Sequence, residues 1–280
     1  MQVGIGLPTT TPGADRGLIL EWARQADAGP FSCLGVFDRL AYDSFDPLVS
    51  LAAAAAVTQR LRLATTILTG PLYNTAVLAK ETSSLDALSG GRLVVGLAVG
   101  ARETDYEVAG VEHRSRGRRL GEQLATLRSY WEGDSIGPKP VQPGGPLLLV
   151  GGLSNQTFAR VARYANGYLH GGGPPRAFGS AAEKARAAWQ DADRPDRLLL
   201  WGMAYFALGN KAAETGQRYL RQYYAFTGPF AEKLAAGLLT TPQSVVQLIR
   251  GYQEAGCDEL ILFPTVSEIN QLQRLAEVLA

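Results

Sequence analysis

Short apolar segments alternate with amphipathic segments along the whole chain. Eight of the apolar segments are each followed by a glycine, a proline or a polar residue, as strands are when they end in a turn. Most of them lack a polar–apolar alternation, which is typical of a strand that is buried on both faces of a parallel sheet. The predicted strands cover residues 3–7, 33–37, 61–68, 92–99, 147–150, 167–170, 198–208 and 258–263.

Amphipathic helices are expected between these strands. Asp15 is placed to cap the first helix, whose apolar side chains recur at spacings of three and four residues. In the last such unit Thr241 is the cap, Pro242 takes the first helical position and Gly256 ends the helix. The other helices are predicted from residue 47, over 75–88 and 116–132, around 158–162, near 180–192 and at the C-terminus, with an irregular stretch at 226–240.

Eight strands that are each followed by a helix predict a single (β/α)8 TIM barrel. The chain has 280 residues, and a barrel of this kind typically has about 250. We therefore expect one barrel domain over residues 1–280. The alternative is a doubly wound sheet, which predicts a GxGxxG turn after the first strand, whereas residues 8–17 are PTTTPGADRG.

The composition argues against several kinds of partner. The formal net charge is +1, so neither nucleic acid nor an anionic membrane is expected to bind. The first residues, MQVGIGLPTT, lack the regions of a signal peptide, and no apolar run is long enough to span a bilayer. We therefore expect a cytoplasmic protein, with Cys33 and Cys257 as buried thiols rather than metal ligands.

In a (β/α)8 barrel the active site lies at the carboxyl ends of the strands. Several of these ends are glycine or small residues, which leaves room for a flat or bulky group over the barrel mouth. Gly151 and Gly152 follow the fifth predicted strand, and Gly171 and Gly172 follow the sixth. Their backbone N–H groups suit a phosphate, although glycines in these positions also fit ordinary turns.

Few side chains at the strand ends carry reactive groups. Asp38 is the one carboxylate directly at a strand end, where it either contacts a ligand or caps the following segment. Arg39 either pairs with Asp38 or offers a cation to a substrate. His170 fits a ligand contact or a structural hydrogen bond, whereas His113 lies in the charged segment VEHRSRGRR and is expected to face solvent.

The sequence contains no supported Ser/His/Asp or Cys/His set for nucleophilic catalysis. It also lacks HxH, HExxH and carboxylate clusters, so no metal site is expected. The reacting group is therefore expected to be an organic cofactor that the barrel binds.

Three segments carry a family resemblance, in order along the chain. They are AKETSSLDALSGGRLVVGLAVG, ETDYEVAGVEHRSRGRRLGEQLATLRSYW and TTPQSVVQLIRGYQEAGCDELILFP. They resemble the bacterial luciferase-like family, which includes FMN-dependent monooxygenases and oxidoreductases that use the deazaflavin coenzyme F420. Weaker resemblance covers LLLVGG, ARYANGYLHGG and the first strand, so most of the chain is included. The resemblance implies a (β/α)8 barrel, in agreement with the strand count.

The resemblance also implies a place for a cofactor phosphate. In deazaflavin members the ring lies over the barrel mouth, and the phosphate lies near the ends of the fifth and sixth strands. The matching residues here are Gly151, Gly152, Gly171 and Gly172. His170 immediately precedes the second glycine group and is included among the candidate cofactor-binding residues.

Other residues match positions around the cofactor ring. Asp38 matches an aspartate that contacts the ring in the family. Thr66 and Ile67 match a bulge that often holds a non-proline cis peptide against the back of the ring. Gly100 and Ala101 lie at the end of the fourth strand, where the absence of a large side chain would let a ring edge or a substrate pass.

Two positions depart from deazaflavin dehydrogenases. Some of those enzymes carry a histidine where this chain has Arg39, and a glutamate where it has Ala101, with Glu103 just beyond. The acid–base pair for oxidation of an alcohol or a sugar phosphate is thus missing. This favours hydride donation to an activated C=C or C=N bond, with the proton supplied by Glu103, Tyr73 or solvent.

The leading hypothesis is a coenzyme F420-dependent oxidoreductase that acts on a small organic molecule as a reductase. Arginine far outnumbers lysine, which indicates a GC-rich genome and mildly favours the deazaflavin. The first alternative is an FMN-dependent monooxygenase that works with a separate flavin reductase, and the second is a barrel that binds without catalysis. The resemblance implies a homodimer, and loops 69–75, 101–115 and 226–240 are expected to form the substrate pocket.

Overall fold

The computed structural model describes residues 1–209 and 211–280. Within these residues the strands follow the hydrophobic pattern closely. They are β1 (Gln2–Gly6), β2 (Cys33–Val36), β3 (Arg62–Thr65), β4 (Leu68–Thr69), β5 (Leu93–Ala98), β6 (Leu147–Gly151), β7 (Gly167–His170), β8 (Leu199–Phe206) and β9 (Glu259–Pro264).

Helices follow the strands and form an outer layer. The α-helices are α1 (Arg16–Ala28), α2 (Pro47–Ala55), α3 (Thr75–Ser89), α4 (Glu103–Val108), α5 (Arg116–Glu132), α6 (Asn155–Tyr164), α7 (Pro175–Asp191), α8 (Ala212–Tyr223), α9 (Phe230–Ala236), α10 (Pro242–Glu254) and α11 (Asn270–Leu279). Short 3-10 helices are η1 (Gly70–Leu72), η2 (His113–Ser115) and η3 (Ala225–Thr227). No helix in the described part of the chain is long and apolar enough to cross a membrane.

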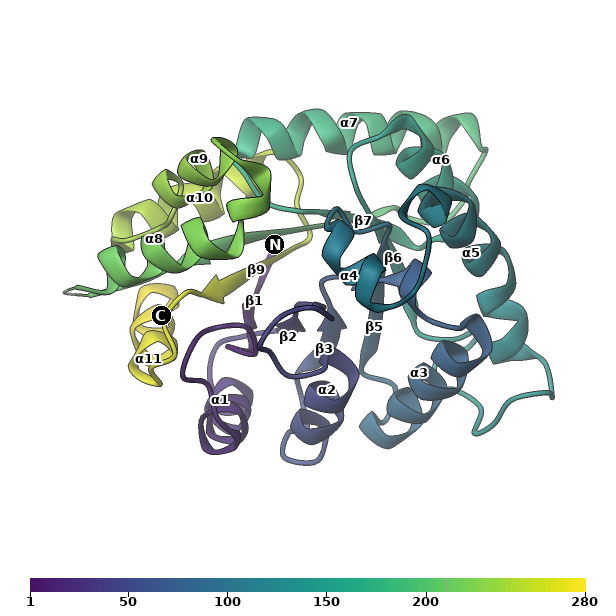
Figure 1. The fold of residues 1–280 in the computed structure, drawn as a ribbon, viewed down its shortest axis with the longest axis horizontal. Coiled ribbons are helices and arrows are strands. Elements are labelled where there is room, and N and C mark those ends of the chain that lie inside the picture. The colour runs from purple at the N-terminus through teal and green to yellow at the C-terminus, as the bar shows by residue number, and fades with distance from the viewer. Residues whose placement is uncertain (210) are drawn as a thin grey trace.

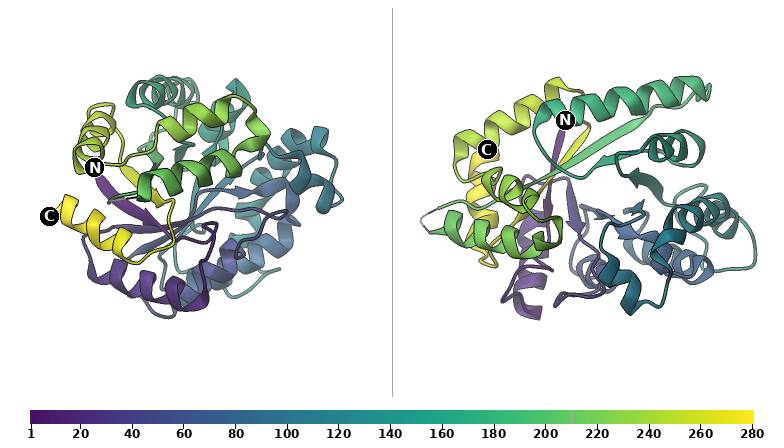
Figure 2. Two further views of the ribbon diagram at one scale, coloured as in Figure 1. Left: turned by 60° about the vertical axis from the view of Figure 1, so that its left-hand side comes forward. Right: turned by 45° about the horizontal axis from the view of Figure 1, so that its top comes forward.

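All strand pairs of the sheet are parallel, and the sheet is closed. The strand order is β3-β2-β1-β9-β8-β7-β6-β5-β4, and a further pairing of β3 with β5 joins the two edges. The helices surround the strands (Figure 1), and the turned views show the strands in the middle of the helical layer (Figure 2). This closed arrangement confirms the predicted (β/α)8 barrel.

The helix caps that the sequence predicts are present. The Asp15 carboxylate accepts a hydrogen bond from the Leu18 N–H at 2.8 Å, which satisfies one of the free donors of α1. Thr241 and Ser244 form a reciprocal capping box at α10, whose first residue is Pro242. Local capping therefore sets where these helices begin.

The third predicted strand, 61–68, is divided into β3 and β4. The Thr66–Ile67 peptide between them is cis, as the resemblance implied. The Thr66 N–H and hydroxyl both donate to the Val36 carbonyl, at 2.8 and 3.0 Å. The division is thus held from the neighbouring strand β2.

The division adds one residue to this edge of the barrel. β5 pairs first with β3, through Ala64 and Val94, and then with β4, through Leu68 and Leu97. The chain takes four steps from Ala64 to Leu68, against three from Val94 to Leu97. The extra residue has the character of a β-bulge at the barrel rim.

Three helical segments differ from the sequence prediction. Residues 226–240 were expected to be irregular, but they contain part of η3 and all of α9. The short α9 lies between Gly228 and Gly237, and such close glycines obscure a helical period. The helix expected near 180–192 begins at Pro175, because proline is favoured in the first turn, and α4 lies in a segment that was read only as charged.

Large side chains fill the inside of the barrel. Trp201, Ile261 and Phe263 belong to the inner cluster of buried residues. Gly6 makes room for one of them, because a Cβ added there would overlap the Phe263 ring. The barrel is thus a packed core with its functional surface at the strand ends. Both cysteines, Cys33 and Cys257, are buried and free, as predicted.

Candidate active site

Asp38 lies just after β2, at the carboxyl end of the barrel. Its Oδ2 atom accepts the Thr69 N–H at 2.8 Å, and the Tyr73 side chain also hydrogen-bonds to the carboxylate. Burial is the main cause that raises the pKa of Asp38 to about 6; the charges of Asp46 and Asp105 act in the same direction, and the two donors oppose them. The Asp38 carboxyl therefore gains and loses its proton close to neutral pH.

Arg39 is tied to a different carboxylate. Its Nε atom lies 3.0 Å from Asp105 Oδ2, and the two side chains are only 6% and 5% exposed. Asp105 also accepts the Ala41 N–H at 2.7 Å, and the guanidinium lies 5.3 Å from the Tyr223 ring centre. Of the two roles that the sequence allows for Arg39, pairing with Asp38 is not the one found, because Asp105 of α4 supplies the carboxylate partner.

The Ile67 side chain, between β3 and β4, lies against the neighbouring strands β5 and β6. A Cβ added at Gly96 would lie 2.9 Å from Ile67 Cγ2, and one at Gly151 would lie 3.2 Å from Ile67 Cδ1. Both glycines thus provide the space that Ile67 occupies. We call Thr66 and Ile67, together with Gly96 and Gly151 against which Ile67 packs, the ledge.

Gly100 is required by its own backbone. Its φ angle is +68°, in the left-handed region, and an added Cβ would lie 2.5 Å from Thr69 Cγ2. The backbone conformation and the Thr69 side chain thus explain the need for glycine here, and no ligand has to be invoked. The sequence had suggested another reason, namely space for a ring edge or a substrate to pass. Ala101, the next residue, is exposed.

His170 and the two glycine groups form a second cluster, at the ends of β6 and β7. The Tyr168 hydroxyl donates to the Gly152 carbonyl at 3.0 Å and lies 3.1 Å from His170 Nδ1. His170 is only 2% exposed, and its Nε2 atom has no hydrogen-bond partner. That atom lies beside the glycine loop, because a Cβ added at Gly173 would be 4.0 Å from it. Burial lowers the pKa of His170.

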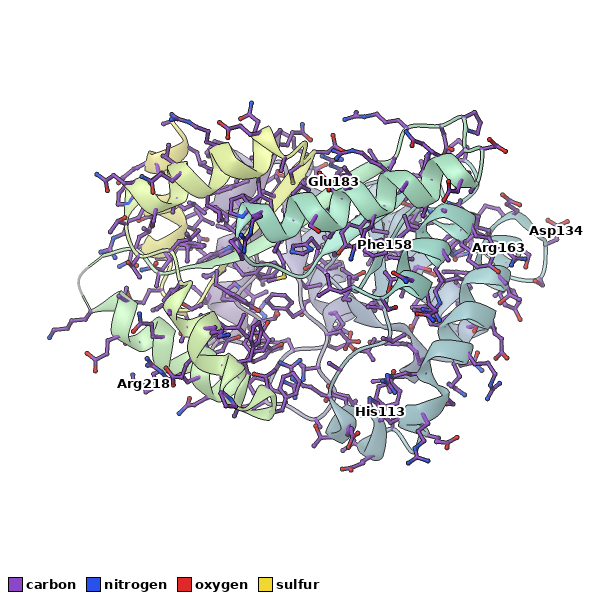
Figure 3. The ribbon with its side chains drawn as sticks, turned by 90° about the horizontal axis from the view of Figure 1, so that it is seen from above. His113, Asp134, Phe158, Arg163, Glu183 and Arg218 are labelled. Carbon is purple, nitrogen blue, oxygen red and sulfur yellow. The ribbon has the colours of Figure 1, made fainter. Side chains whose placement is uncertain are left out.

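Glu103 lies away from both clusters. Its side chain is 72% exposed and pairs with His113 Nδ1 at 3.2 Å. The expectation that His113 faces solvent is wrong, because its side chain is 22% exposed and its ring packs edge-on against Tyr106 at 5.0 Å. Figure 3 shows His113 at the periphery of the molecule. Tyr73, in contrast, lies with Asp38.

The sequence analysis missed an aromatic wall at the mouth, contributed by α8, η3 and Arg102. The Arg102 guanidinium lies 4.5 Å from the Tyr223 ring centre and 4.3 Å from that of Phe226, and it donates to the Tyr223 carbonyl at 3.1 Å. The Tyr205 and Tyr224 hydroxyls share a hydrogen bond of 2.6 Å. The run RYLRQYYAF, with tyrosines four residues apart, was the available signal.

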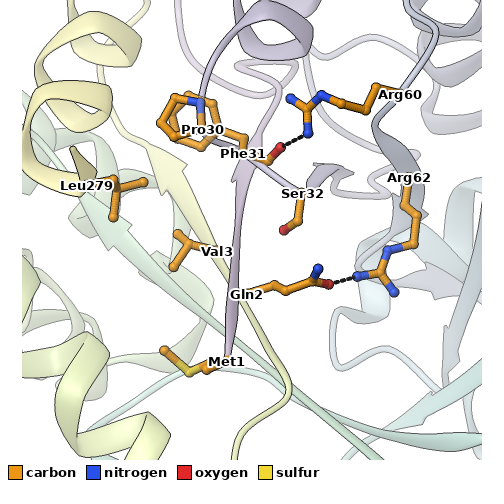
Figure 4. A pocket seen from close by; sticks show the side chains of 9 residues that line it. All are labelled: Met1, Gln2, Val3, Pro30, Phe31, Ser32, Arg60, Arg62 and Leu279. Atoms are coloured by element: carbon orange, nitrogen blue, oxygen red, sulfur yellow. Dashed lines mark hydrogen bonds between the residues drawn. The ribbon is translucent and has the colours of Figure 1, made fainter.

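A pocket of about 700 Å³ lies at the opposite end of the barrel. Figure 4 shows its lining, which includes the start of β1 and the residues just before β2 and β3. Its two arginines are already engaged, Arg60 with the Phe31 carbonyl at 2.6 Å and Arg62 with Glu259 at 2.5 Å. This pocket is therefore separate from the strand ends that carry Asp38 and His170.

The comparisons with known proteins decide the family. A model of the luciferase-like monooxygenase family matches residues 1–238. The chain belongs to the luciferase-like monooxygenase family. An uncharacterized family relative from Mycobacterium tuberculosis is 32% identical over 189 residues, which are 55% of this chain and 65% of the relative. The chain thus spans just under two thirds of that relative's length.

Other relatives of this luciferase-like chain have named activities. The oxygenase component of flavin-dependent trigonelline monooxygenase from Acinetobacter baylyi is 26% identical over 266 residues, 76% of this chain and 72% of that protein. The F420-dependent tetrahydromethanopterin reductase from Methanopyrus kandleri has a TM-score of 0.79 at 16% identity, covering 99% and 97% of the two chains. Monooxygenase RslO1 from Streptomyces bottropensis has the same TM-score at 20% identity and the same coverage. These structural matches show the shared fold.

In this luciferase-like barrel most of the predicted site residues, with the exception of Arg39, Ala101 and Glu103, fall into two groups on neighbouring parts of the mouth. The first group lies after β2, β3, β4 and β5, and the second lies at the ends of β6 and β7. The first group comprises Asp38, Thr66, Ile67, Tyr73 and Gly100, and the second comprises Gly151, Gly152, His170, Gly171 and Gly172.

Proposed function

We propose that the protein is a coenzyme F420-dependent oxidoreductase that reduces a small organic substrate. The observation that carries this proposal is the state of Asp38. Its side chain is half-buried at the strand ends, its pKa is raised to about 6, and its hydrogen-bond donors are uncharged. A carboxyl of this kind can give a proton to a substrate near neutral pH.

The residues present fit the cofactor in two places. His170 Nε2 is a buried polar atom beside Gly173 that has no hydrogen-bond partner, and a phosphate oxygen would satisfy it once this nitrogen carries a proton. The Thr66–Ile67 ledge offers an apolar surface for the back of a flat ring. We infer that the second group of residues holds the phosphate and that the first contacts the ring.

The proposed reaction is a two-electron reduction. When bound, the reduced cofactor supplies a hydride to an activated C=C or C=N bond. Asp38 supplies the proton that completes the reduction, so the substrate gains two hydrogen atoms in all. The Tyr73 side chain hydrogen-bonds to the resulting carboxylate and stabilises it.

The aromatic wall is proposed to face the substrate. Arg102 and Tyr223 combine a flat apolar surface with a cation, and this surface follows β5 and β8, where loops line the mouth of a barrel. Such a surface suits a planar, partly apolar molecule. Glu103, the exposed first residue of α4, pairs with His113, so we propose Asp38 in its place as the proton donor.

Titration of the purified protein with coenzyme F420 and, separately, with FMN tests the proposal by changes in fluorescence. We expect selective binding of F420. The reduced complex should then be oxidised anaerobically by an activated alkene or imine at a rate that does not depend on oxygen. Failure to bind F420 would overturn the proposal.

A second function is favoured by one observation. The oxygenase component of trigonelline monooxygenase, which is flavin-dependent, aligns with 76% of this chain. Selective FMN binding, together with oxygen consumption in the presence of a separate flavin reductase, would establish an FMN-dependent monooxygenase instead.

A further inference from the structure

The hydrogen bonds around His170 define which of its ring nitrogens carries the proton. The Tyr168 hydroxyl has a single hydrogen, and the Gly152 carbonyl at 3.0 Å can only accept it. The phenol oxygen must then accept from His170 Nδ1 at 3.1 Å. This arrangement favours the neutral tautomer of His170 that has its proton on Nδ1 and a lone pair on Nε2.

That lone pair is buried and faces the glycine loop. Nε2 has no hydrogen-bond partner, and its residue is 2% exposed. The neighbouring loop contains Gly172 and Gly173, both with positive φ angles, and ends at the start of α7. A lone pair at this position repels an anion, whereas an N–H group would bind one.

We propose that His170 takes up a proton from solvent when the cofactor phosphate binds, and that its imidazolium becomes the buried cation of the phosphate site. The inference rests on the proposed function, because it concerns the phosphate of the same cofactor. No bond other than N–H is formed or broken.

The surroundings of His170 explain why the proton would arrive with the ligand. From β7 the titratable neighbour is Tyr168, and from α10 Tyr252 donates to the Gly173 carbonyl at 2.9 Å. Burial raises the pKa of both tyrosines, so they stay neutral. Phe178 of α7 packs edge-on against the imidazole ring at 5.8 Å, and β8 presents Met203 to the loop.

The pKa of His170 is lowered by burial, while the Gly172 backbone raises it. Among the described residues no carboxylate is one of the groups that shift this pKa. An imidazolium here would therefore lack a counter-ion until an anion binds in the loop. Proton uptake and anion binding thus stabilise each other, and the affinity should rise as the pH falls.

The two cofactors differ in their phosphate chemistry. F420 carries a phosphodiester, which has no exchangeable proton near neutral pH. FMN carries a phosphomonoester, whose second pKa is about 6 and which can therefore bring a proton of its own. F420 should take up about one proton from solvent on binding, whereas FMN should take up less.

Nuclear magnetic resonance of the histidine side chains gives the direct test. The chain has two histidines, so selective labelling with nitrogen-15 gives two sets of ring signals, and His113→Asn assigns them. In the free protein at pH 7 we expect His170 to be neutral with its proton on Nδ1. Saturation with F420 at the same pH should give the doubly protonated ring, while His113 stays unchanged.

Binding as a function of pH gives the second test. The dissociation constant of F420 should increase toward tenfold per pH unit over the range in which only the bound form is protonated. His170→Asn keeps an amide near Tyr168 and removes the far nitrogen, so binding below pH 6 should weaken about tenfold and lose its pH dependence. His170→Gln offers a neutral donor, so it should lose the pH dependence with a smaller loss of affinity.

The outcomes separate this inference from the proposed function. F420 binding with a neutral His170, or with the same pH dependence in His170→Asn, would overturn the inference and leave the function intact. Binding of neither F420 nor FMN would overturn both. Wild-type resonance data decide the question even if a variant fails to fold.

Discussion

Two carboxyl groups with raised pKa values lie at opposite ends of the barrel, and their surroundings differ. Glu259, at the start of β9, is completely buried, lies 2.5 Å from Arg62 and accepts a hydrogen bond from Ser32. Asp38, just after β2, receives the Thr69 N–H and the Tyr73 side chain, which are both uncharged. Burial raises the pKa of both carboxyls, but a nearby arginine opposes it only at Glu259.

The difference separates structural from chemical use of a buried acid. A cation beside a carboxylate stabilises the charged form and couples that charge to folding. Neutral donors stabilise the charged form less, so the acid keeps a proton that it can give away. We therefore expect substitutions at the Asp38 end to affect the reaction and substitutions at the Glu259 end to affect stability.

The largest effect is expected for Asp38→Asn. The amide keeps the shape but has no proton to donate, so single-turnover oxidation of reduced F420 by substrate should slow about 100-fold. The free energy of unfolding should change by less than about 1 kcal/mol, because the carboxyl group is replaced by a neutral amide of equal size. Stopped-flow absorbance under anaerobic conditions measures the rate. A rate within threefold of the wild type would remove Asp38 from the mechanism.

Arg62→Met should break the opposite end. Glu259 would lose its cation, and we expect the free energy of unfolding at pH 7 to fall by about 2 kcal/mol. This is below the usual cost of breaking a buried pair because the Arg62 side chain is 32% exposed. Urea denaturation at pH 7 and pH 5 measures it. The loss should be smaller at pH 5, because burial raises the pKa of Glu259 and its unpaired carboxyl is more readily protonated as the pH falls; an equal loss at both pH values would contradict the pairing.

Tyr73→Phe sharpens the comparison without removing the acid. The Tyr73 hydrogen bond lowers the pKa of Asp38, so its loss should raise that pKa above about 6. Asp38 is protonated below its pKa, so the reduction rate should decline with rising pH, and the decline should move upward by about half a unit to one unit. The pH profile of the single-turnover rate measures this. A downward shift would show that the hydroxyl stabilises the protonated acid instead.

The smallest effect is expected where neither partner is charged. Tyr205→Phe removes the 2.6 Å hydrogen bond to Tyr224 in the aromatic wall. We expect the free energy of unfolding to fall by about 1 kcal/mol, with no change in its pH dependence below pH 9. Thermal unfolding at several pH values checks both statements. A pH-dependent loss would mean that this hydrogen bond is coupled to a group that titrates below pH 9.

Most of the fold could be predicted from local patterns. Caps such as Asp15 and Thr241 act within one helical turn, and apolar runs such as that of β5 mark buried strands wherever they lie. The ends of the elements were less predictable. Pro174 and Pro175 suggested a loop, but α7 begins at Pro175, and the glycines on either side of α9 suggested an irregular stretch, but a short helix lies between them.

The candidate site could be predicted only in part. Asp38 and His170 were found because they end strands, and a barrel brings strand ends together. The partner of Arg39 could not be found in this way, because Asp105 lies 66 positions away in a short helix that charged residues concealed. The tyrosines of α8 were overlooked because spaced aromatic residues on a helix usually indicate core packing.

The extra residue beside the ledge also reverses the phase of the strand. Leu63 and Leu68 both pack outward, in the cluster between the strands and the helices, although five positions separate them. Ala64 and Ile67 both pack toward the inside of the barrel. In a regular strand the two members of each pair would point to opposite faces. The position of everything downstream, including the Thr69 N–H on Asp38, thus depends on the number of residues rather than on their type. Substitutions do not change this number of residues. Deletion of a single residue would exchange the inward-facing and outward-facing side chains of β4.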